Sequence, residues 1–257
     1  MDAGLAQRLV KLTESFYQTE ASSFSATRTR GWEGWERLFR LLAAERPDKL
    51  VVSDVAAGNG RFGRALADAL PDVCIRYQAI DSCAPLMDEA KTWPRSVEAV
   101  RFEHDLIVPL LEGRPALPPA LEPADLVCCF GFLHHVPSTE ARLRLVQELV
   151  DAAVPGGLIA LALWRFADDP VRARRAEATT DEACQELGIP RDELGLGDYL
   201  LGWRGRPGVW RYCHSFTEEE SEAIADSVLD RVSVEASYLA DGKSHDQNHY
   251  LVLRKRT

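Results

Sequence analysis

No apolar run in the 257-residue sequence approaches the length of a membrane span, and Met1–Gly4 offers neither the basic start nor the apolar core of a secretion signal. We therefore expect a cytoplasmic protein that does not act at a membrane. The six cysteines include no C-x-x-C pair, a spacing typical of zinc sites and redox-active pairs. We expect reduced thiols in the core and no bound metal.

Positive charge is also scarce: 30 lysines and arginines stand against 40 acids, which gives a formal net charge of -10. Such a balance argues against a generic nucleic-acid-binding surface and leaves room only for a local basic patch. With 46% hydrophobic residues, the chain has enough apolar material for one elaborated α/β domain. We expect that domain to span residues 1–257, with an N-terminal helical arm or lid at 1–45 and a helix-rich, substrate-side insertion at about 165–215.

The most informative stretch is Val51–Phe62, where an apolar run changes into a glycine-spaced turn and then into the start of a helix. The β-branched residues indicate a buried strand. Gly58 and Gly60 would let the backbone approach a ligand closely, because neither carries a Cβ. By itself the pattern is weak, since a plain tight turn has the same appearance.

Acidic residues follow two further predicted strands. The strand at residues 73–80 ends at Asp81, about twenty residues after the glycines, where a carboxylate can bind ribose hydroxyls. The next strand is followed by Asp105, and a fourth, residues 124–130, precedes a polar turn. Because the carboxyl ends of parallel strands share one crevice, the sequence predicts a ligand site there.

Two families use this arrangement. Counted from Gly58, the pattern Gly-x-Gly-x-x-Gly is complete at Gly63, as in dinucleotide-dependent oxidoreductases. Asp54 before the glycines and Pro155–Gly157 before a fifth strand instead resemble class I S-adenosylmethionine (SAM)-dependent methyltransferases. This resemblance implies an α/β fold with a seven-stranded Rossmann-like sheet of order 3-2-1-4-5-7-6, its last strand antiparallel and helices on both faces.

His134 and His135 stand at the carboxyl end of the fourth strand, where ligands bind in open α/β sheets. One of them could face a substrate while the other packs, or both could be structural. Upstream, Phe24, Arg28, Arg30 and Trp32 form either a lid whose arginine holds a carboxylate or a loop with solvated arginines.

Residues 203–214 combine three arginines, two tryptophans, a tyrosine and a histidine without a single acid. Aromatic side chains alternating with arginines can stack on bases and bind phosphates, and the same composition also occurs in ordinary packing. Both interpretations remain open at this stage.

Four segments together carry a closer resemblance: Phe24–Arg28, Phe132–His135, Pro155–Gly157 with Trp164, and Arg211–Phe216. They are similar to the eukaryotic tRNA wobble-uridine methyltransferases, which methylate the carboxylate of 5-carboxymethyluridine at the anticodon wobble position and work with a small zinc-binding partner. The sequence departs from the family where Ala56-Ala57 replace Gly-Cys, Cys83 replaces serine and Glu33 replaces proline.

The resemblance implies an EC 2.1.1-type enzyme that uses SAM, releases S-adenosylhomocysteine and needs no metal, with tRNA and a small activator protein as partners. The alternatives are a small-molecule carboxyl or hydroxyl O-methyltransferase and a non-catalytic SAM-binding partner module. The predicted catalytic residues are His134, His135 and Arg28. The predicted cofactor-binding residues are Arg30, Asp54, Ala56, Gly58, Gly60, Asp81, Ser82, Asp105, Leu106 and Phe130. The predicted substrate-binding residues are Trp32, Trp164, Arg204, Arg206, Arg211, Tyr212 and His214.

Overall fold

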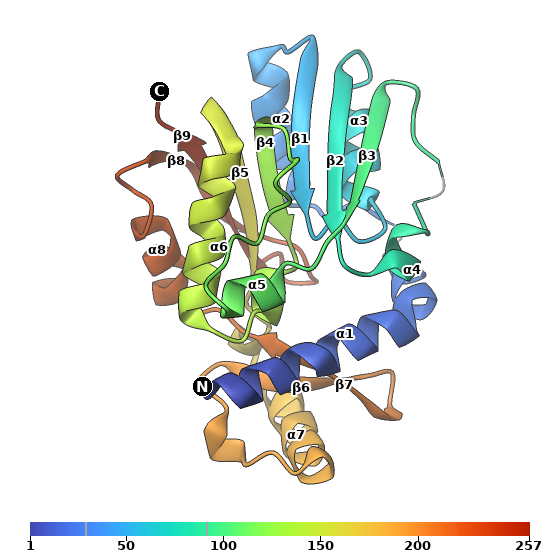
Figure 1. The fold of residues 1–257 in the computed structure, drawn as a ribbon, viewed down its shortest axis with the longest axis vertical. Coiled ribbons are helices and arrows are strands. Elements are labelled where there is room, and N and C mark those ends of the chain that lie inside the picture. Colours follow the sequence, from blue (N-terminus) through green and yellow to red (C-terminus); the bar gives the residue numbers. More distant parts are fainter. Residues whose placement is uncertain (29, 91) are drawn as a thin grey trace.

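A seven-stranded sheet runs through the centre of the computed structural model, which describes residues 1–28, 30–90 and 92–257 (Figure 1). Thr29, part of the predicted arm, and Lys91 lie outside the described residues. The sheet strands are β1 (Lys49–Val55), β2 (Cys74–Asp81), β3 (Val97–Glu103), β4 (Ala124–Phe130), β5 (Ala153–Trp164), β8 (Val232–Ala240) and β9 (Asn248–Lys255).

The strand order is β3-β2-β1-β4-β5-β9-β8. The first five strands are parallel, and β9 is antiparallel to both β5 and β8. When the separate hairpin β6–β7 is set aside, β8 and β9 are the sixth and seventh sheet strands. The predicted α/β fold and the order 3-2-1-4-5-7-6 are therefore confirmed.

Burial follows the position of each strand in the sheet. Every residue of the central strand β4 except Asp125 is buried, because helices cover both of its faces. The edge strand β3 instead carries exposed Glu98, Arg101 and Glu103. A near-continuous apolar run is what a parallel strand in the middle of a sheet requires, and charged edges keep further strands from pairing.

Helices cover the two faces of the sheet. On one face pack α5 (Ile107–Leu111), α6 (Thr139–Ala152) and α8 (Glu218–Asp226). On the other face pack α2 (Trp35–Glu45) and α3 (Arg61–Ala69). The short helix α4 (Ala84–Met87) follows β2. Among the described residues, no helix is long and apolar enough to cross a membrane.

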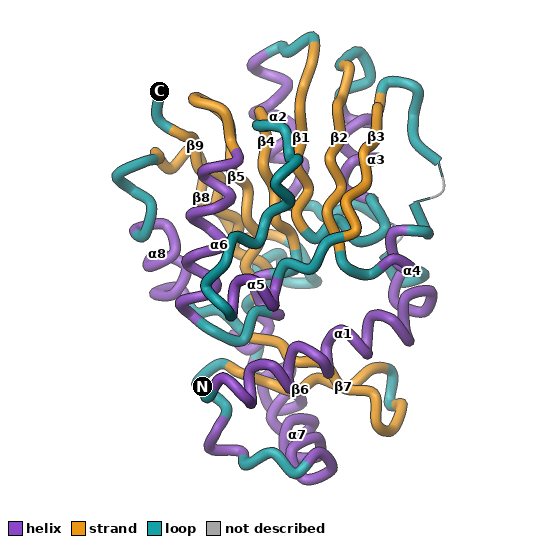
Figure 2. Tube along the Cα trace, viewed as in Figure 1, coloured by secondary structure: helices purple, strands orange, loops and turns teal. Residues whose placement is uncertain are grey.

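The helix α1 (Ala3–Ser25) lies across the carboxyl ends of the strands, between the sheet and a smaller layer (Figure 2). Asp2 caps its start by accepting from the N–H groups of Gly4 and Leu5. The smaller layer consists of α7 (Pro170–Leu187) and a two-stranded sheet, β6 (Asp198–Trp203) and β7 (Arg206–His214). Helix α1 thus separates the sheet's carboxyl edge from residues inserted after β5.

The prediction of a helix-rich insertion is wrong for its second half. Residues 198–214 form the antiparallel hairpin β6–β7. Arg204 and Gly205, with φ angles of 50° and 68°, form its tight turn, because such two-residue turns need positive φ. The strand β7 is buried from Trp210 to His214, where α1 and α7 pack against the hairpin. Contacts with helices distant in sequence thus stabilise strands that the local pattern did not indicate.

Candidate active site

A cavity of about 930 Å³ opens at the carboxyl ends of β1, β2, β4 and β5, beneath α1. It brings together most of the residues predicted for the site. Those that line it are Arg28, Arg30, Trp32, Asp54, Ala56, Gly58, Asp81, Ser82, Asp105, Leu106, Phe130, His134, His135, Trp164 and Arg211. Those that do not are Gly60, Arg204, Arg206, Tyr212 and His214.

Sequence reasoning missed several lining residues, among them Tyr17, Arg61, Asp241 and Asn248. Tyr17 belongs to an apolar stripe of α1 and Arg61 begins α3, and neither pattern by itself indicates a site. Asp241 and Asn248 bound the loop between β8 and β9, which has no motif that indicates a site. These residues reach the cavity only because the folded chain brings distant segments together.

The turn after β1 has an unusual backbone. Ala56, Gly58 and Gly60 all have positive φ, at 64°, 55° and 67°. For alanine this conformation costs about 1–2 kcal/mol, so the surrounding structure must impose it. A Cβ on Gly60 would lie 2.7 Å from the Trp93 ring. Glycine is therefore required at position 60 for packing as well as for conformation, although the residue lies behind the cavity wall.

Asp81 ties this turn to the end of β2. One carboxylate oxygen accepts from the N–H of Gly58 at 2.8 Å and the other from the N–H of Cys83 at 2.8 Å. Burial raises the pKa of Asp81, and these two N–H groups oppose that rise by stabilising the ionised form. Each oxygen keeps a further lone pair with which it can accept from a ligand hydroxyl.

Two other acids lie at strand ends. Asp54 is buried, and its carboxylate accepts from the hydroxyl of Tyr77 and from the thiol of Cys128 at 3.4 Å. Burial raises its pKa to about 6. Asp105 caps α5 by accepting from the N–H of Ile107 at 2.9 Å. The cavity therefore has acidic side chains at the ends of β1, β2 and β3.

His135 is fully engaged by the protein. Its Nδ1 lies 2.8 Å from the carbonyl oxygen of Tyr212, which can only accept, so Nδ1 carries the proton. Its Nε2 then accepts from the Tyr17 hydroxyl at 2.8 Å. Burial lowers the pKa of His135 to about 3, so the ring is neutral. His135 thus joins the end of β4 to both α1 and β7.

His134 differs from its neighbour because its Nδ1 has no hydrogen-bond partner among the described residues. The side chain is 7% exposed, and its ring centroid lies 5.1 Å from that of Trp164. Burial, with the nearby His135 and Arg211, holds its pKa well below 6.5. His134 therefore lines the cavity with a neutral imidazole, and its buried Nδ1 has no partner among the described residues.

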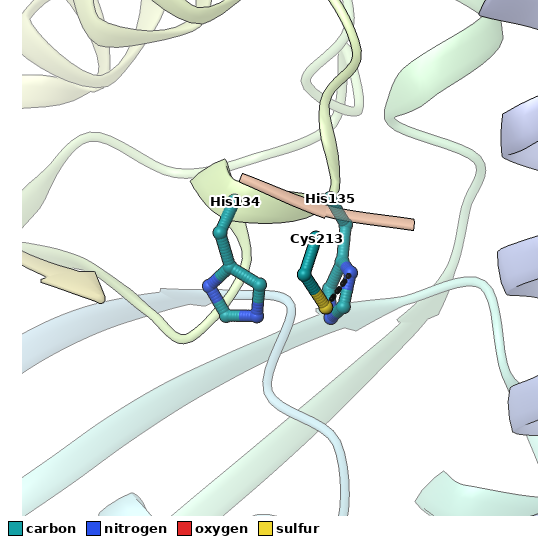
Figure 3. A group of neighbouring side chains, drawn as sticks. All are labelled: His134, His135 and Cys213. Carbon is teal, nitrogen blue, oxygen red and sulfur yellow. Dashed lines mark hydrogen bonds between the residues drawn. The ribbon is translucent and has the colours of Figure 1, made fainter. Parts of the chain in front are cut away.

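His134 and His135 also form a three-residue group with Cys213, whose donor atoms all lie within 4.8 Å of one another (Figure 3). Burial raises the pKa of Cys213 to about 11, which keeps the thiol protonated. Nδ1 of His135 is already bonded to a carbonyl, and Arg211 adds positive charge nearby. These features disfavour a metal cation at this position.

The predicted substrate residues outside the cavity hold the insertion together. The Tyr212 hydroxyl donates to Asp198 at 2.6 Å, and His214 lies between Asp198 and Glu220, at 2.7 and 2.9 Å. Arg206 pairs with Glu20 of α1. Arg204 is exposed at the hairpin turn.

Residues 53–161 match the family model described as a methyltransferase domain. The chain is 24% identical over 221 residues to the probable tRNA methyltransferase 9B of Bos taurus, which covers 83% of this chain and 44% of that protein. It is 27% identical over 155 residues to a mouse tRNA (carboxymethyluridine(34)-5-O)-methyltransferase. That match covers 60% of this chain and 20% of the mouse protein. The chain thus spans less than half the length of these curated relatives.

Two solved structures have a similar fold. One is the 1,6-didemethyltoxoflavin-N1-methyltransferase of Burkholderia thailandensis, solved with S-adenosylhomocysteine. It has a TM-score of 0.58 at 13% identity, and the match covers 98% of this chain and 91% of that one. A putative methyltransferase solved in complex with a methyltransferase activator from Haloferax volcanii has a TM-score of 0.61 at 12% identity. The match covers 95% of this chain and 98% of that one. The sheet order, the match of residues 53–161 to a methyltransferase domain and the relatives together show that the chain resembles class I SAM-dependent methyltransferases, among them the tRNA wobble-uridine methyltransferases.

Proposed function

We propose that the chain transfers the methyl group of SAM to the carboxylate of 5-carboxymethyluridine at the wobble position of a tRNA. One observation carries the proposal: a single cavity joins the acids at the strand ends to His134 and to Arg28 and Arg211, which have no acidic partner among the described residues. The relatives named as tRNA methyltransferases, at 23–27% identity, support tRNA as the substrate.

The cavity residues fit the cofactor. The left-handed backbone at Ala56 and Gly58 leaves the end of β1 open for the methionine part, next to the carboxylate of Asp54. Asp81 has lone pairs for the ribose hydroxyls, and Asp105 with Leu106 faces the adenine in this arrangement. SAM supplies a methyl group on a positively charged sulfur, which a nucleophile can displace.

The residues on the acceptor side have an orienting role. A carboxylate is ionised at neutral pH, so the acceptor needs no general base. The neutral His134 lines the cavity beside Trp164 and can orient the acceptor by packing against it. The protein then contributes mainly alignment of nucleophile, methyl carbon and sulfur.

A second candidate is a small carboxylate-bearing metabolite, which the net charge of -10 favours over a polyanionic tRNA. A non-catalytic SAM-binding module is the third. The proposal also includes a small activator protein, because a similar fold was solved in complex with a methyltransferase activator.

The test is transfer of labelled methyl from SAM to tRNA bearing 5-carboxymethyluridine, run beside unmodified tRNA and a small-molecule extract, with and without a candidate activator. We expect label only on the modified tRNA, as an alkali-labile ester. Label only in the extract would replace tRNA by a small acid. Tight SAM binding without any label would favour the non-catalytic module.

A further inference from the structure

Arg211 is a buried cation whose charge no acid of the protein balances. The residue is 7% exposed, and its guanidinium lies 4.7 Å from the Phe16 ring centroid and 5.4 Å from that of Trp203. Its one backbone acceptor is the carbonyl of Gly202, at 3.5 Å. No carboxylate lies within ion-pair distance among the described residues. Burial of an unpaired charge is costly, so such a residue points to a partner outside the chain.

Arg142, another buried arginine, is the internal comparison. It lies 3.7 Å from the carboxylate of Asp198, donates to the Tyr212 hydroxyl at 2.8 Å and donates to the carbonyl of Val136 at 2.9 Å. Where arginine serves the fold, the protein thus supplies an acid and several acceptors. Arg211 has neither, although it lines the cavity wall.

Four arginines line the cavity, and besides the exposed Arg30 they are Arg28, Arg61 and Arg211. The guanidinium of Arg61 lies 4.7 Å from the Trp32 ring centroid and 5.2 Å from that of Trp35. Burial lowers the pKa of Arg61 to about 10, and the positive charge of Arg28 contributes to this lowering. Burial likewise lowers the pKa of Arg28, and Arg211 lowers it further. The guanidinium groups of Arg28 and Arg211 both lie near the Trp203 ring, at 5.9 and 5.4 Å from its centroid, whereas Arg61 directly follows the glycine turn.

SAM has a single carboxylate, and in the proposed function the methionine part that carries it lies at the glycine turn, which Arg61 directly follows. Arg211 instead lies beside the histidine pair, because it precedes Tyr212 in β7 and the Tyr212 carbonyl accepts from His135 at 2.8 Å. We propose that Arg211 determines acceptor specificity by binding the carboxylate of the methyl acceptor. This inference rests on the proposed function and names the residue that selects its substrate.

The chemistry is consistent with that role. One acceptor oxygen accepts from the guanidinium, while a lone pair of the other oxygen forms the O–C bond as the C–S bond breaks and its electrons stay on sulfur. No proton is released, and the product is a neutral methyl ester. The ester cannot make a charge-assisted hydrogen bond to Arg211, which favours its release.

The experiment measures binding of two probes to the protein loaded with S-adenosylhomocysteine: the nucleoside 5-carboxymethyluridine and its neutral amide, 5-carbamoylmethyluridine. We expect wild type to bind the carboxylate at least about tenfold more tightly than the amide, as a charged hydrogen bond predicts. Arg211→Gln should bring the ratio of the two probe affinities close to one, and its affinity for SAM should be unchanged. Arg174→Gln, the same change at an exposed position of α7, should keep the wild-type ratio.

Several results would overturn the inference. Equal binding of the two probes by wild type does so without any variant, even if Arg211→Gln does not fold. The inference is also overturned if Arg211→Gln keeps the wild-type preference for the carboxylate probe over the amide. Arg211→Lys keeps the charge but loses the planar fork, so it should weaken carboxylate binding several-fold, and unchanged affinity contradicts the proposal.

The two proposals fail separately. If modified tRNA is methylated but Arg211→Gln still prefers the carboxylate probe, the proposed function stands and Arg211 is not the specificity residue. If no tRNA is labelled but nucleoside binding depends on Arg211, the carboxylate site stands and the tRNA substrate is wrong.

Discussion

Asp54 lies at the end of β1, buried between Tyr77 and Cys128, and its charge is therefore poorly solvated. Burial raises its pKa from 3.8 to about 6, and two side-chain hydrogen bonds limit the rise. Folding thus favours the protonated form at mildly acidic pH. A bound ligand with a positive charge would favour the ionised form instead, which links this residue to cofactor binding.

Asp54→Asn tests this prediction in the ligand-free protein. The wild-type folded state binds more protons than the unfolded state between pH 4 and 6, so its stability falls as pH rises through that window. The shift corresponds to about 3 kcal/mol. We expect the variant to gain about that much relative to wild type between pH 4 and 7, measured by urea unfolding. The exposed variant Asp48→Asn should show no such gain, and parallel curves for Asp54→Asn and wild type would refute the prediction.

Helix α1 connects both ends of the cavity. Near its middle, Thr13 accepts from the N–H of Tyr212 at 3.1 Å, and Tyr17 donates to His135 at 2.8 Å. At its end, the hydroxyl of Ser25 accepts from the side chain of Asn59, in the glycine turn, at 2.8 Å. One helix therefore contacts the predicted cofactor turn, the histidine pair and the insertion.

Tyr17→Phe should loosen this helix. The change leaves the buried Nε2 of His135 without a donor, which costs about 1–3 kcal/mol. We expect faster amide hydrogen exchange in residues 3–25, by about tenfold or more, and unchanged exchange in β4 and β5, because the lost contact holds only α1. Ser22→Ala, which removes an exposed 3.4 Å contact to Glu89, is the control and should leave exchange unchanged. Equal exchange in Tyr17→Phe and wild type would show that other contacts hold the helix.

The charge of the whole molecule limits how it can meet a polyanion. Its net charge is -10. The cavity and the nearby hairpin turn carry a few exposed cations that form no ion pair with an acid among the described residues, including Lys11, Arg30 and Arg204. Arg206 is engaged by Glu20. A tRNA therefore has few phosphate contacts available on this face.

This arrangement predicts a shallow salt dependence for a tRNA complex. About three phosphate contacts to a single-stranded loop give a slope of magnitude about 2 in a plot of log affinity against log salt. The measurement is a binding titration at several salt concentrations, with Arg204→Gln expected to reduce the slope by about 0.7. A much steeper slope would mean that another surface, or a partner protein, carries the RNA.

Much of the fold was predictable because its cause is local. Central parallel strands are apolar on both faces, so β1, β4 and β5 are recognisable as apolar runs, and the turn glycines and Asp81 follow at fixed spacing. The helix α8 begins with a capping box between Thr217 and Glu220, which likewise depends only on residues close in sequence. The hairpin β6–β7 was missed because helices distant in sequence bury it.

The sequence by itself determined which residue types gather at the strand ends, since strand burial and turn chemistry are encoded within short segments, and its resemblance to class I methyltransferases implied the sheet order. Only the tertiary structure decided which side chains are free to act. Both ring nitrogens of His135 are occupied by partners 118 and 77 residues away, whereas the buried Nδ1 of His134 has no partner among the described residues. Arg206 is paired across 186 residues with Glu20, whereas Arg211 faces the cavity without an acid. Such pairings depend on segments that meet only in the folded chain, so no local pattern could have specified them.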